Sequence, residues 1–358
     1  MATKIWFIAG ISGGHIIPCL TMAQQLKKEF PKCKILFFST NTPTDHAILE
    51  KNELIDTHVT LPLRRVPWSI AQYPRFIAHT VVSFLYSFYH LMRQRPDKIV
   101  STGGLISIPV CFAAWILRIP IELYELNAIP GKALIKLAPL ATRIFYCFDG
   151  TKNYLAEPFA ERIAYPLRHT KQDKAFLQTD ACKELGLNPF KKTICILGGS
   201  QGSLFLNNFI KEWATTNTAE DIQIIHQTGP DSNTNWHAFY QDLGVSAYVF
   251  SFKRDIARCY QAADLIICRA GAGTIFEVAF FEKPCILIPL ETSSTSHQID
   301  NAYEISKEFP RQFAALEQDV AQKNKHFAYT LIKSMLSINQ KIKSHQNELG
   351  SINNSYQQ

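Results

Sequence analysis

A strand pattern that runs into a glycine-rich turn and then into a helix pattern occurs twice in this chain, and it constrains the fold more than any other feature. The first copy is the apolar run 5–9 followed by the turn 10–15, and the second is the apolar run 193–197 followed by the turn 198–202. Continuously apolar strands that alternate with helices are typical of parallel sheets covered on both faces. We therefore predict an α/β protein with two Rossmann-like, doubly wound parallel-sheet domains that face a cleft.

The length of 358 residues also favours two domains, because it exceeds what one compact core accommodates. Further strand candidates end in polar or glycine-rich loops, where open α/β sheets place their ligands. These candidates are 34–38, 98–101, 119–124, 222–226, 265–268 and 285–288. We predict one domain over 1–167, a second over 168–336, and a polar tail over 337–358 that is frayed or disordered.

Composition narrows the class of protein. The formal net charge of +7 favours anionic partners such as nucleotides, nucleic acid or an anionic lipid surface. No Arg/Lys block or zinc-finger spacing occurs, so we favour a mildly basic enzyme without a nucleic-acid partner. The nine cysteines are dispersed in apolar runs, which predicts reduced core thiols without disulfides or structural zinc. Because a strand pattern starts at Lys4, we expect no signal peptide and a cytoplasmic chain.

The two glycine turns suit phosphate groups, because backbone N–H groups at a helix N-terminus bind anions. Neither turn is a G-x-G-x-x-G motif, and the second strand of the first half ends in Ser39 instead of an acid, which disfavours a dinucleotide dehydrogenase. Gly131-Lys132 is followed by Ala133, which disfavours a P-loop NTPase. No Asp-x-Asp pair occurs, so we predict no required cofactor, with a divalent cation possible but no metal motif.

The segment 264–277 indicates an anion site more directly. A strand pattern ends at Arg269, a turn of small residues follows, and a helix is predicted to begin near Thr274. The N–H groups of the turn and the helix dipole would together make an anion site. For Glu277 the residues leave two interpretations open: a carboxylate that accepts hydrogen bonds from ribose hydroxyls, or a first-turn partner of the helix dipole.

An ordered set of segments resembles the MurG family of peptidoglycan glycosyltransferases. The set is 10–18, 102–104, 130–131, 198–202, 268–272, and His297-Gln298 with Asn301. The resemblance implies a GT-B fold and inverting transfer of N-acetylglucosamine from UDP-N-acetylglucosamine to the muramoyl sugar of the undecaprenyl-diphosphate-linked precursor, from lipid I to lipid II. It also implies a peripheral enzyme on the cytoplasmic face of the inner membrane, with the acceptor in the N-terminal half and the donor in the C-terminal half.

Individual roles follow from the resemblance by position. Glu277 would hold the ribose, the backbone at Lys253 would read the uracil, and Gln298 would contact the sugar hydroxyls. The residues implied at the diphosphate, at the domain junction and across from the acceptor are Ser12, Gly13, Gly14, His15, Gly103, Gly104, Asn127, Arg168, Ser200, Ala272, Gly273 and Thr274.

Departures from the family pattern lie on the acceptor side or near the hinge, at Leu105, Tyr124, Leu126, Ala164 and Tyr165. They leave open a GT-B transferase that acts on another lipid, such as diacylglycerol. A non-catalytic UDP-sugar-binding scaffold is the alternative of another class.

His15 is the candidate catalytic base, since a neutral imidazole accepts a proton from an acceptor hydroxyl at pH 7. From the residues alone, a histidine that merely starts the helix is equally compatible with the spacing, and the resemblance favours the base. Arg168 and the helix after Gly273 would stabilise the departing UDP.

Two neighbouring segments bear on membrane attachment. The loop with Arg64, Arg65, Trp68 and Ile70 combines cations with apolar side chains and is predicted to lie on anionic lipid. The stretch 74–93 is predicted to be a core helix with a thin polar stripe, because two histidines and two serines disfavour a membrane span. The stripe consists of His79, Ser83, Ser87, His90 and Gln94.

Overall fold

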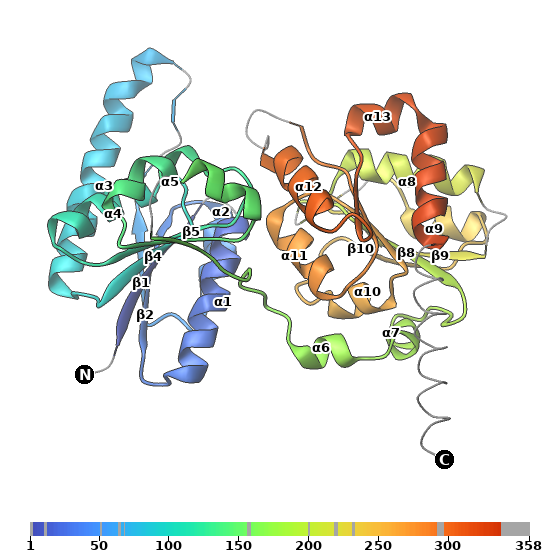
Figure 1. Cartoon of the computed structure of the whole chain (residues 1–358), viewed down its shortest axis with the longest axis horizontal. Helices are drawn as coiled ribbons and strands as arrows, with labels where there is room; N and C mark the ends of the chain where they lie inside the picture. Colours follow the sequence, from blue (N-terminus) through green and yellow to red (C-terminus); the bar gives the residue numbers. More distant parts are fainter. Residues whose placement is uncertain are drawn as a thin grey trace. The chain divides into compact units, whose positions relative to one another are not determined.

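The computed structural model describes residues 3–10, 13–50, 52–63, 66–67, 69–155, 159–199, 201–217, 221–230, 233–291 and 297–337. The chain divides into two compact units, Met1–Arg168 and His169–Gln358. Each unit contains one sheet in which all strands are parallel, with helices beside it (Figure 1). The predicted pair of parallel-sheet α/β domains is confirmed. The expected polar tail lies outside the described residues after Ser337.

The first unit contains a seven-stranded sheet in the order β3-β2-β1-β4-β5-β6-β7. Its strands are β1 (Lys4–Ile8), β2 (Lys34–Thr40), β3 (Thr57–Leu61), β4 (Lys98–Ser101), β5 (Ile121–Glu125), β6 (Arg143–Tyr146) and β7 (Ala160–Arg162). Its helices are α1 (Gly13–Glu29), α2 (Pro43–Leu49), α3 (Tyr73–Arg93), α4 (Ser107–Ile116) and α5 (Lys132–Leu137), with short 3₁₀ turns η1 (Ile70–Gln72), η2 (Ala138–Leu140) and η3 (Asp149–Tyr154).

Alternating side chains of the central strands explain why this sheet is covered on both faces. Trp6 and Ile8 of β1 belong to one buried cluster together with residues of α3, α4 and α5. Ile5 and Phe7 belong to another, together with residues of α1 and α2. Because successive strand residues point to opposite faces, a continuously apolar strand needs helices on both sides.

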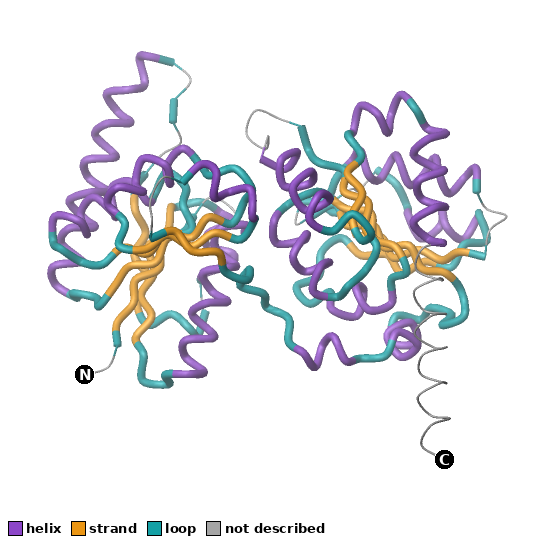
Figure 2. The backbone as a smooth tube through the Cα atoms, in the orientation of Figure 1, coloured by secondary structure: helices purple, strands orange, loops and turns teal. Residues whose placement is uncertain are grey.

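The second unit contains a six-stranded sheet in the order β10-β9-β8-β11-β12-β13. Its strands are β8 (Lys192–Leu197), β9 (Ile222–Gln227), β10 (Ala247–Phe250), β11 (Leu265–Cys268), β12 (Cys285–Leu287) and β13 (Phe313–Ala315). Its helices are α6 (Lys171–Ala175), α7 (Gln178–Glu184), α8 (Leu204–Thr216), α9 (Trp236–Asp242), α10 (Ala257–Ala262), α11 (Ala272–Phe280), α12 (His297–Glu308) and α13 (Gln318–Lys323). Figure 2 shows the sheet between helices on its two sides.

Both sheets reverse their strand order at an equivalent place. The first strand of each unit pairs with the second strand on one side and with the fourth on the other, so the reversal lies between β1 and β4 and between β8 and β11. In open α/β sheets, ligands bind outside the carboxyl ends of the strands at this switch point. A ligand site is therefore expected in the loops that follow these four strands.

Helix α3 corrects the expected core helix. The predicted polar stripe faces the protein, because Ser83 and Ser87 are fully buried, whereas Ile77, Leu85 and Met92 are 56%, 58% and 59% exposed. The Ser87 hydroxyl donates to the Ser83 carbonyl oxygen over 2.7 Å, so its polarity is satisfied within the helix. Among the described residues, no helix combines the length and the apolar character that crossing a membrane requires.

All nine cysteines are buried, as predicted for core thiols. Cys268 and Cys285 approach most directly, with their sulfur atoms 3.6 Å apart on neighbouring strands. Their burial raises the pKa of Cys285 well above the usual value, which keeps the thiol protonated.

Candidate functional site

The switch point of the first unit brings His15 to the loop after β4. His15 lies in the first turn of α1, and its Nδ1 atom donates to the Thr102 carbonyl oxygen over 2.8 Å. In return, the Thr102 hydroxyl donates to the His15 carbonyl oxygen over 3.1 Å. A carbonyl oxygen only accepts hydrogen bonds, so Nδ1 carries the proton and Nε2 is the basic nitrogen of the neutral ring. This is the tautomer that a general base at Nε2 requires.

Position 10, shortly before His15, has no room for a side chain. A Cβ atom on Gly10 would lie 3.0 Å from the Thr40 hydroxyl and 3.1 Å from the Asp45 carboxylate. Gly13 and Gly14 then form the first turn of α1, where backbone N–H groups have no partner within the helix. The predicted contact Ser12 lies outside the described residues. The turn and the helix N-terminus together form a place where an anionic or hydroxyl group can approach the backbone.

The glycines predicted on the acceptor side lie in the loop that holds His15. Gly103 and Gly104 have φ angles of 91° and 83°, a conformation that side chains other than glycine rarely adopt. No described atom would lie within 4 Å of a Cβ atom at either position. The Ser107 hydroxyl donates to the Gly103 carbonyl oxygen over 2.7 Å, and the Gly103 N–H donates to Ser101 Oγ over 3.1 Å. Two buried serines thus stabilise a glycine turn with open space beside it.

Asn127 follows β5, the strand next to β4, and a buried carboxylate positions it. Glu125 is 4% exposed and accepts hydrogen bonds from the backbone N–H groups of Asn127 and Gly131, both over 2.9 Å. It also accepts from Asn127 Nδ2 over 3.3 Å. Burial raises the pKa of Glu125 to about 7, although these hydrogen bonds oppose the shift. The Glu125 side chain therefore organises the loop 126–131 that presents Asn127.

The switch point of the second unit begins with a sterically locked turn after β8. Gly202 has a φ angle of 74° and Gly229 one of 71°. A Cβ atom on Gly202 would lie 2.6 Å from the Gly229 Cα atom, and one on Gly229 would lie 2.5 Å from the Gly202 Cα atom. The turns after β8 and β9 therefore pack backbone against backbone. The predicted diphosphate contact Ser200 in this turn lies outside the described residues.

Helix α11 begins earlier than predicted. Its first residue is Ala272, and Gly271 precedes it without a side-chain hydrogen bond to the helix. The backbone N–H groups of Ala272, Gly273 and Thr274 are therefore first-turn donors that the helix itself does not satisfy. The start shifts from near Thr274 because Gly271 already has an extended conformation that ends the turn. Residues 272–274 retain the predicted geometry of an anion site, now with all three in the helix.

A buried arginine connects the turns that follow β8 and β11. Arg269 is 8% exposed, and its Nε atom donates to the hydroxyl of Ser203, the residue that caps α8. Its Nη1 atom donates to the carbonyl oxygens of Ile288 and Pro289, each over 3.1 Å. Desolvation lowers the pKa of Arg269 to about 10, so the guanidinium remains charged at neutral pH. A fixed positive charge, borne by the residue three positions before α11, therefore lies among the turns after β8, β11 and β12.

Glu277 lies too far along α11 to act as a first-turn partner of the helix dipole. It is the sixth residue of the helix, and the first turn contains no acidic residue. Its carboxylate is 9% exposed and accepts a hydrogen bond of 2.7 Å from the Tyr260 hydroxyl. Residues 273 and 274 lie four and three positions earlier, on the same helix face. Glu277 is therefore a buried acceptor on the helix face that also carries residues 273 and 274.

Of the remaining predicted contacts, Gln298 and Lys253 lie in the second unit and Arg168 lies in the first. Gln298, in the first turn of α12, accepts the backbone N–H of Leu290 over 3.0 Å through Oε1, which directs its Nε2 donor the other way. Asn301 is fully buried and donates to the Ala270 carbonyl oxygen over 3.2 Å, so α12 supports the turn before α11. Lys253 lies between β10 and α10, with its Nζ atom 3.2 Å from the Tyr248 hydroxyl. Arg168 ends the first unit, and its reach to a donor stays a prediction.

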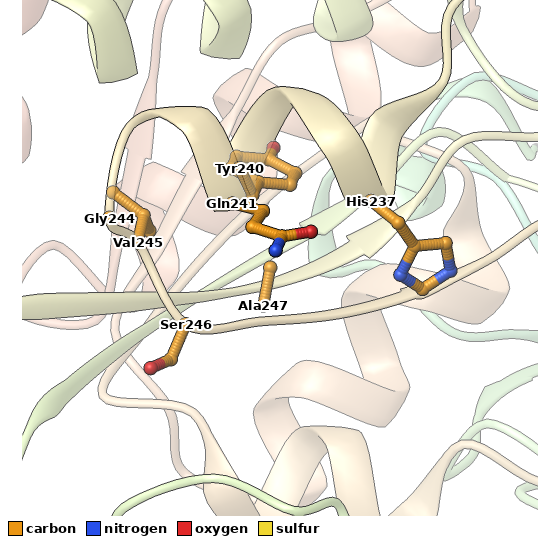
Figure 3. A pocket seen from close by; sticks show the side chains of 7 residues that line it. All are labelled: His237, Tyr240, Gln241, Gly244, Val245, Ser246 and Ala247. Atoms are coloured by element: carbon orange, nitrogen blue, oxygen red, sulfur yellow. The ribbon is translucent and has the colours of Figure 1, made fainter.

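The hollows in the described part of the second unit include the following two. One of about 260 Å³ lies beside the turns after β8 and β9 and is lined by Gln201, Ser203, Asn207 and Thr228, among others. The other, of about 320 Å³, lies between α9 and the start of β10, where His237 and Gln241 project from the helix (Figure 3). Of these two hollows, the first adjoins the switch point. In the residues that the structure describes, no group of three or more His, Cys, Asp or Glu side chains could hold a metal ion.

Three residues of the site that were not predicted from the sequence form hydrogen bonds with predicted site residues or with their turns. Glu125, Arg269 and Tyr260 each hold a predicted site residue or turn in place. Arg269 could have been found, because it stands at a strand end directly before the glycine turn. Glu125 could have been found in the same way, because it is the last residue of β5. Tyr260 carries no such local signal, since it is a buried aromatic residue of the core.

Comparisons with known proteins identify the family. The glycosyltransferase family 28 N-terminal domain matches residues 5–146, and the corresponding C-terminal domain matches residues 193–355. A protein of Protochlamydia amoebophila, named UDP-N-acetylglucosamine–N-acetylmuramyl-(pentapeptide) pyrophosphoryl-undecaprenol N-acetylglucosamine transferase, is 34% identical over 84% of this chain and 80% of its own length. A Thermotoga protein with the same name is 30% identical over 85% of both chains.

Solved structures agree in fold. The crystal structure of Acinetobacter baumannii MurG has a TM-score of 0.73 at 24% identity and covers 96% of this chain and 95% of its own. A UDP-GlcNAc 2-epimerase from Neisseria meningitidis bound to UDP-GlcNAc has a TM-score of 0.54 at 14% identity, over 86% and 92% of the two chains. The predicted GT-B fold is confirmed. This chain belongs to glycosyltransferase family 28 and, within it, to the MurG family of N-acetylglucosamine transferases.

Proposed function

We propose that this chain transfers N-acetylglucosamine from UDP-N-acetylglucosamine to the muramoyl sugar of an undecaprenyl-diphosphate-linked precursor, with inversion at the anomeric carbon. The relatives at 34% and 30% identity are named for this donor and this lipid-linked acceptor. The observation that carries the proposal is the second-unit switch point. There, the first-turn N–H groups of α11, the charge of Arg269 and the carboxylate of Glu277 match a diphosphate next to a ribose.

The chemistry requires a base for the acceptor hydroxyl and positive potential for the leaving group. His15 Nε2 takes the hydroxyl proton while the hydroxyl oxygen attacks the anomeric carbon. The bond from that carbon to the diphosphate oxygen breaks, and UDP leaves with the electron pair. The Thr102 carbonyl oxygen, 2.8 Å from Nδ1, stabilises the imidazolium that forms. Arg269 and the N-terminus of α11 compensate the charge that develops on UDP.

The proposed contacts beyond this core follow the family pattern. Gln298 Nε2 donates to sugar hydroxyls, and the backbone at Lys253 reads the uracil. Gly13 and Gly14 approach the reacting sugars through their N–H groups, together with Ser12. Arg168 and Ser200 contact the diphosphate. Because Arg269 and α11 supply charge compensation from the protein, the proposal includes no required metal, and full activity in excess EDTA is the expected result.

Three of the departures from the family pattern, Leu105, Tyr124 and Leu126, concern packing within the first unit. Leu126 is 2% exposed, and the Tyr124 ring lies 4.7 Å from that of Phe145. Leu105 packs against the buried cluster of the first unit. In contrast, Asn127 and its buried partner Glu125 are both present. This pattern favours the lipid-linked muramoyl acceptor over diacylglycerol.

A UDP-release assay tests the function. With UDP-N-acetylglucosamine and a lipid-linked muramoyl-peptide, we expect release that depends on both substrates. A panel with UDP-glucose, UDP-galactose and diacylglycerol measures donor and acceptor selectivity. Release with diacylglycerol alone would favour the other lipid transferase, and UDP binding without any release would indicate a scaffold.

We also propose that the outer face of α3 attaches the chain to the cytoplasmic surface of the inner membrane. This face exposes Tyr73, Ile77, Val81, Val82, Leu85, Tyr86, Tyr89 and Met92, and α4 adds Phe112, Trp115 and Ile116. The rings of Phe84 and Phe112, 5.8 Å apart, connect the two helices. Ile70, just before α3, is 86% exposed. An apolar surface of this kind next to cations such as Arg75 and Arg93 suits an anionic lipid surface. The predicted loop residues Arg64, Arg65 and Trp68 lie outside the described residues.

Vesicle flotation tests the attachment. Ile77→Ser, Leu85→Ser and Met92→Ser together should abolish binding to vesicles that contain anionic phospholipid. Phe190→Ser is the matched control, because Phe190 is 91% exposed but lies in the second unit. Equal binding of the triple variant and the control would remove α3 from this role.

A further inference from the structure

The two side chains that approach the Glu277 carboxylate, Tyr260 and His169, pack together with the ring of Phe281. Tyr260 comes from α10, Phe281 ends α11, and His169 is the first residue of the second unit. The Tyr260 and Phe281 rings stack with centroids 5.1 Å apart, and the His169 ring lies edge-on at 5.1 Å from Phe281 and 5.8 Å from Tyr260. The two residues that approach the carboxylate are thus held by ring contacts with each other and with Phe281.

Tyr260 fixes one oxygen of this carboxylate. The Tyr260 side chain is fully buried, and its hydroxyl donates to Glu277 Oε2 over 2.7 Å. A hydrogen bond from a hydroxyl to an ionised carboxylate is about twice as strong as one between neutral groups. Because the ring cannot move without disturbing its stack with Phe281, the hydroxyl holds the carboxylate in one orientation.

His169 faces the other oxygen. Its Nε2 atom lies 3.6 Å from Glu277 Oε1, and the His169 side chain is 5% exposed. Within the described part of the chain, this buried nitrogen has no hydrogen-bond partner. A buried polar atom without a partner is costly, so its position beside a carboxylate calls for a role. A small rotation of either side chain would bring the two atoms within hydrogen-bond distance.

We propose that Tyr260 and His169 are positioning residues that aim Glu277 at the hydroxyls of a ribose and thereby select ribonucleoside over 2′-deoxyribonucleoside diphosphates. The proposal rests on the function proposed above, in which Glu277 holds the ribose of the donor. Neither residue contacts the reacting atoms. Their effect is to keep the carboxylate on the face of α11 that carries residues 273 and 274, so that ribose and diphosphate are bound by one helix.

Calorimetric binding of UDP and 2′-deoxy-UDP to the full-length protein tests the proposal without catalysis. The wild type should bind UDP more tightly, and Glu277→Ala should bind both nucleotides equally. Tyr260→Phe removes only the hydroxyl and should reduce the UDP preference by about 5-fold or more. His169→Leu should also reduce it, whereas His169→Gln, which keeps a donor near Oε1, should restore most of it. In steady-state assays, the KM for the UDP-sugar should rise more than kcat falls in Tyr260→Phe.

Tyr240→Phe is the matched control. Tyr240 is equally buried in the same unit, but its hydroxyl bonds His226 Nδ1 over 3.0 Å instead of Glu277. It should leave the preference for UDP unchanged. Equal loss in Tyr260→Phe and Tyr240→Phe would overturn the proposal, because it would indicate general softening of the unit. Full preference in both Tyr260→Phe and His169→Leu would also overturn it. If the wild type itself bound neither nucleotide, the proposed function would fail instead.

Discussion

The two units share one topology and use it for different chemistry. In each, a side chain crosses the switch point and connects the loops after the first and fourth strands. In the first unit this is His15, which donates to the Thr102 carbonyl oxygen. In the second it is Arg269, which donates to the Ser203 hydroxyl. The same topology therefore brings a titratable imidazole to one switch point and a permanently charged guanidinium to the other.

The glycine turns at the two switch points also differ. Gly103 and Gly104 have positive φ angles with open space beside them, whereas Gly202 and Gly229 have positive φ angles and touch each other. The first unit uses glycine to reach a conformation, and the second also uses it to bring two loops together. The turn at Gly103 and Gly104 is open on one side, and the turns at Gly202 and Gly229 are closed against each other.

Replacing the crossing side chain of the first unit should have the largest effect. His15→Ala should lower turnover by about 10²–10⁴-fold, because it removes the general base. UDP affinity should stay close to that of the wild type, since that site lies in the second unit. Turnover and nucleotide binding measured side by side check this. His237→Ala, an exposed histidine in the second unit, is the control, and near-normal turnover of His15→Ala would refute the assignment.

The crossing side chain of the second unit should behave in the opposite way. Arg269→Met should reduce kcat/KM by about 10²-fold and weaken UDP binding, because a fixed charge near the leaving group is lost. Arg269→Lys should lose less, since it keeps the charge but not the fork of donors. Arg258→Met removes an ion pair of 2.9 Å with Glu184 on another part of the unit and serves as the control. Unchanged UDP binding in Arg269→Met would contradict the role of Arg269 as the fixed charge of the second unit.

The two kinds of glycine turn predict different costs in stability. Gly202→Ala should lower the free energy of unfolding by about 3 kcal/mol. The new Cβ atom would collide with backbone atoms, and the alanine would also have to adopt a positive φ angle. Gly103→Ala should lower the free energy of unfolding by only about 1 kcal/mol, because the positive φ angle is then the single source of strain. Urea unfolding of both variants measures the difference. Equal losses of stability in the two variants would show that the backbone around Gly202 shifts to make room for the new Cβ atom.

A pH-dependent effect is expected at Glu125 in the first unit. Its pKa rises from 4.5 to about 7 on folding, so the folded state binds the proton more tightly than the unfolded state. The stabilisation from protonated Glu125 is complete below pH 4.5 and is lost as the pH rises through 7. Between pH 5 and pH 8 this loss is on the order of 2 kcal/mol. Glu125→Gln should flatten that part of the profile in urea unfolding at several pH values, whereas Glu184→Gln, a surface change, should leave it intact.

Much of the fold and part of the site followed from local sequence. The apolar runs at 5–9 and 193–197 predicted central parallel strands, because a strand buried on both faces needs apolar residues at every position. The glycine turns and His15 could also be located from the sequence, because the residues that favour a turn lie within the turn itself. The start of α11 was misplaced by two residues, because Ala272 and Gly273 carry no capping side chain that would mark a boundary.

Helix α3 shows where local reasoning fails. Its periodicity correctly grouped Ser83 and Ser87 on one stripe, but the pattern does not state which side of a helix faces the core. The structure turns the stripe inward, since Phe84 and Phe88 beside it pack against the sheet and the apolar outer face remains exposed. A helix with apolar residues on both sides has two acceptable orientations, and only its neighbours choose between them.

The sequence by itself determined the two parallel sheets, their glycine turns and the helix N-termini that can bind anions, because these depend on residues close together in the chain. Only the tertiary structure decided that Arg269 joins Ser203, that Glu125 holds Asn127 and Gly131, and that Tyr260 orients Glu277. Some of these contacts connect residues on different strands and helices. The free energy that selects them comes from burial and from satisfying buried polar groups, which local sequence does not encode.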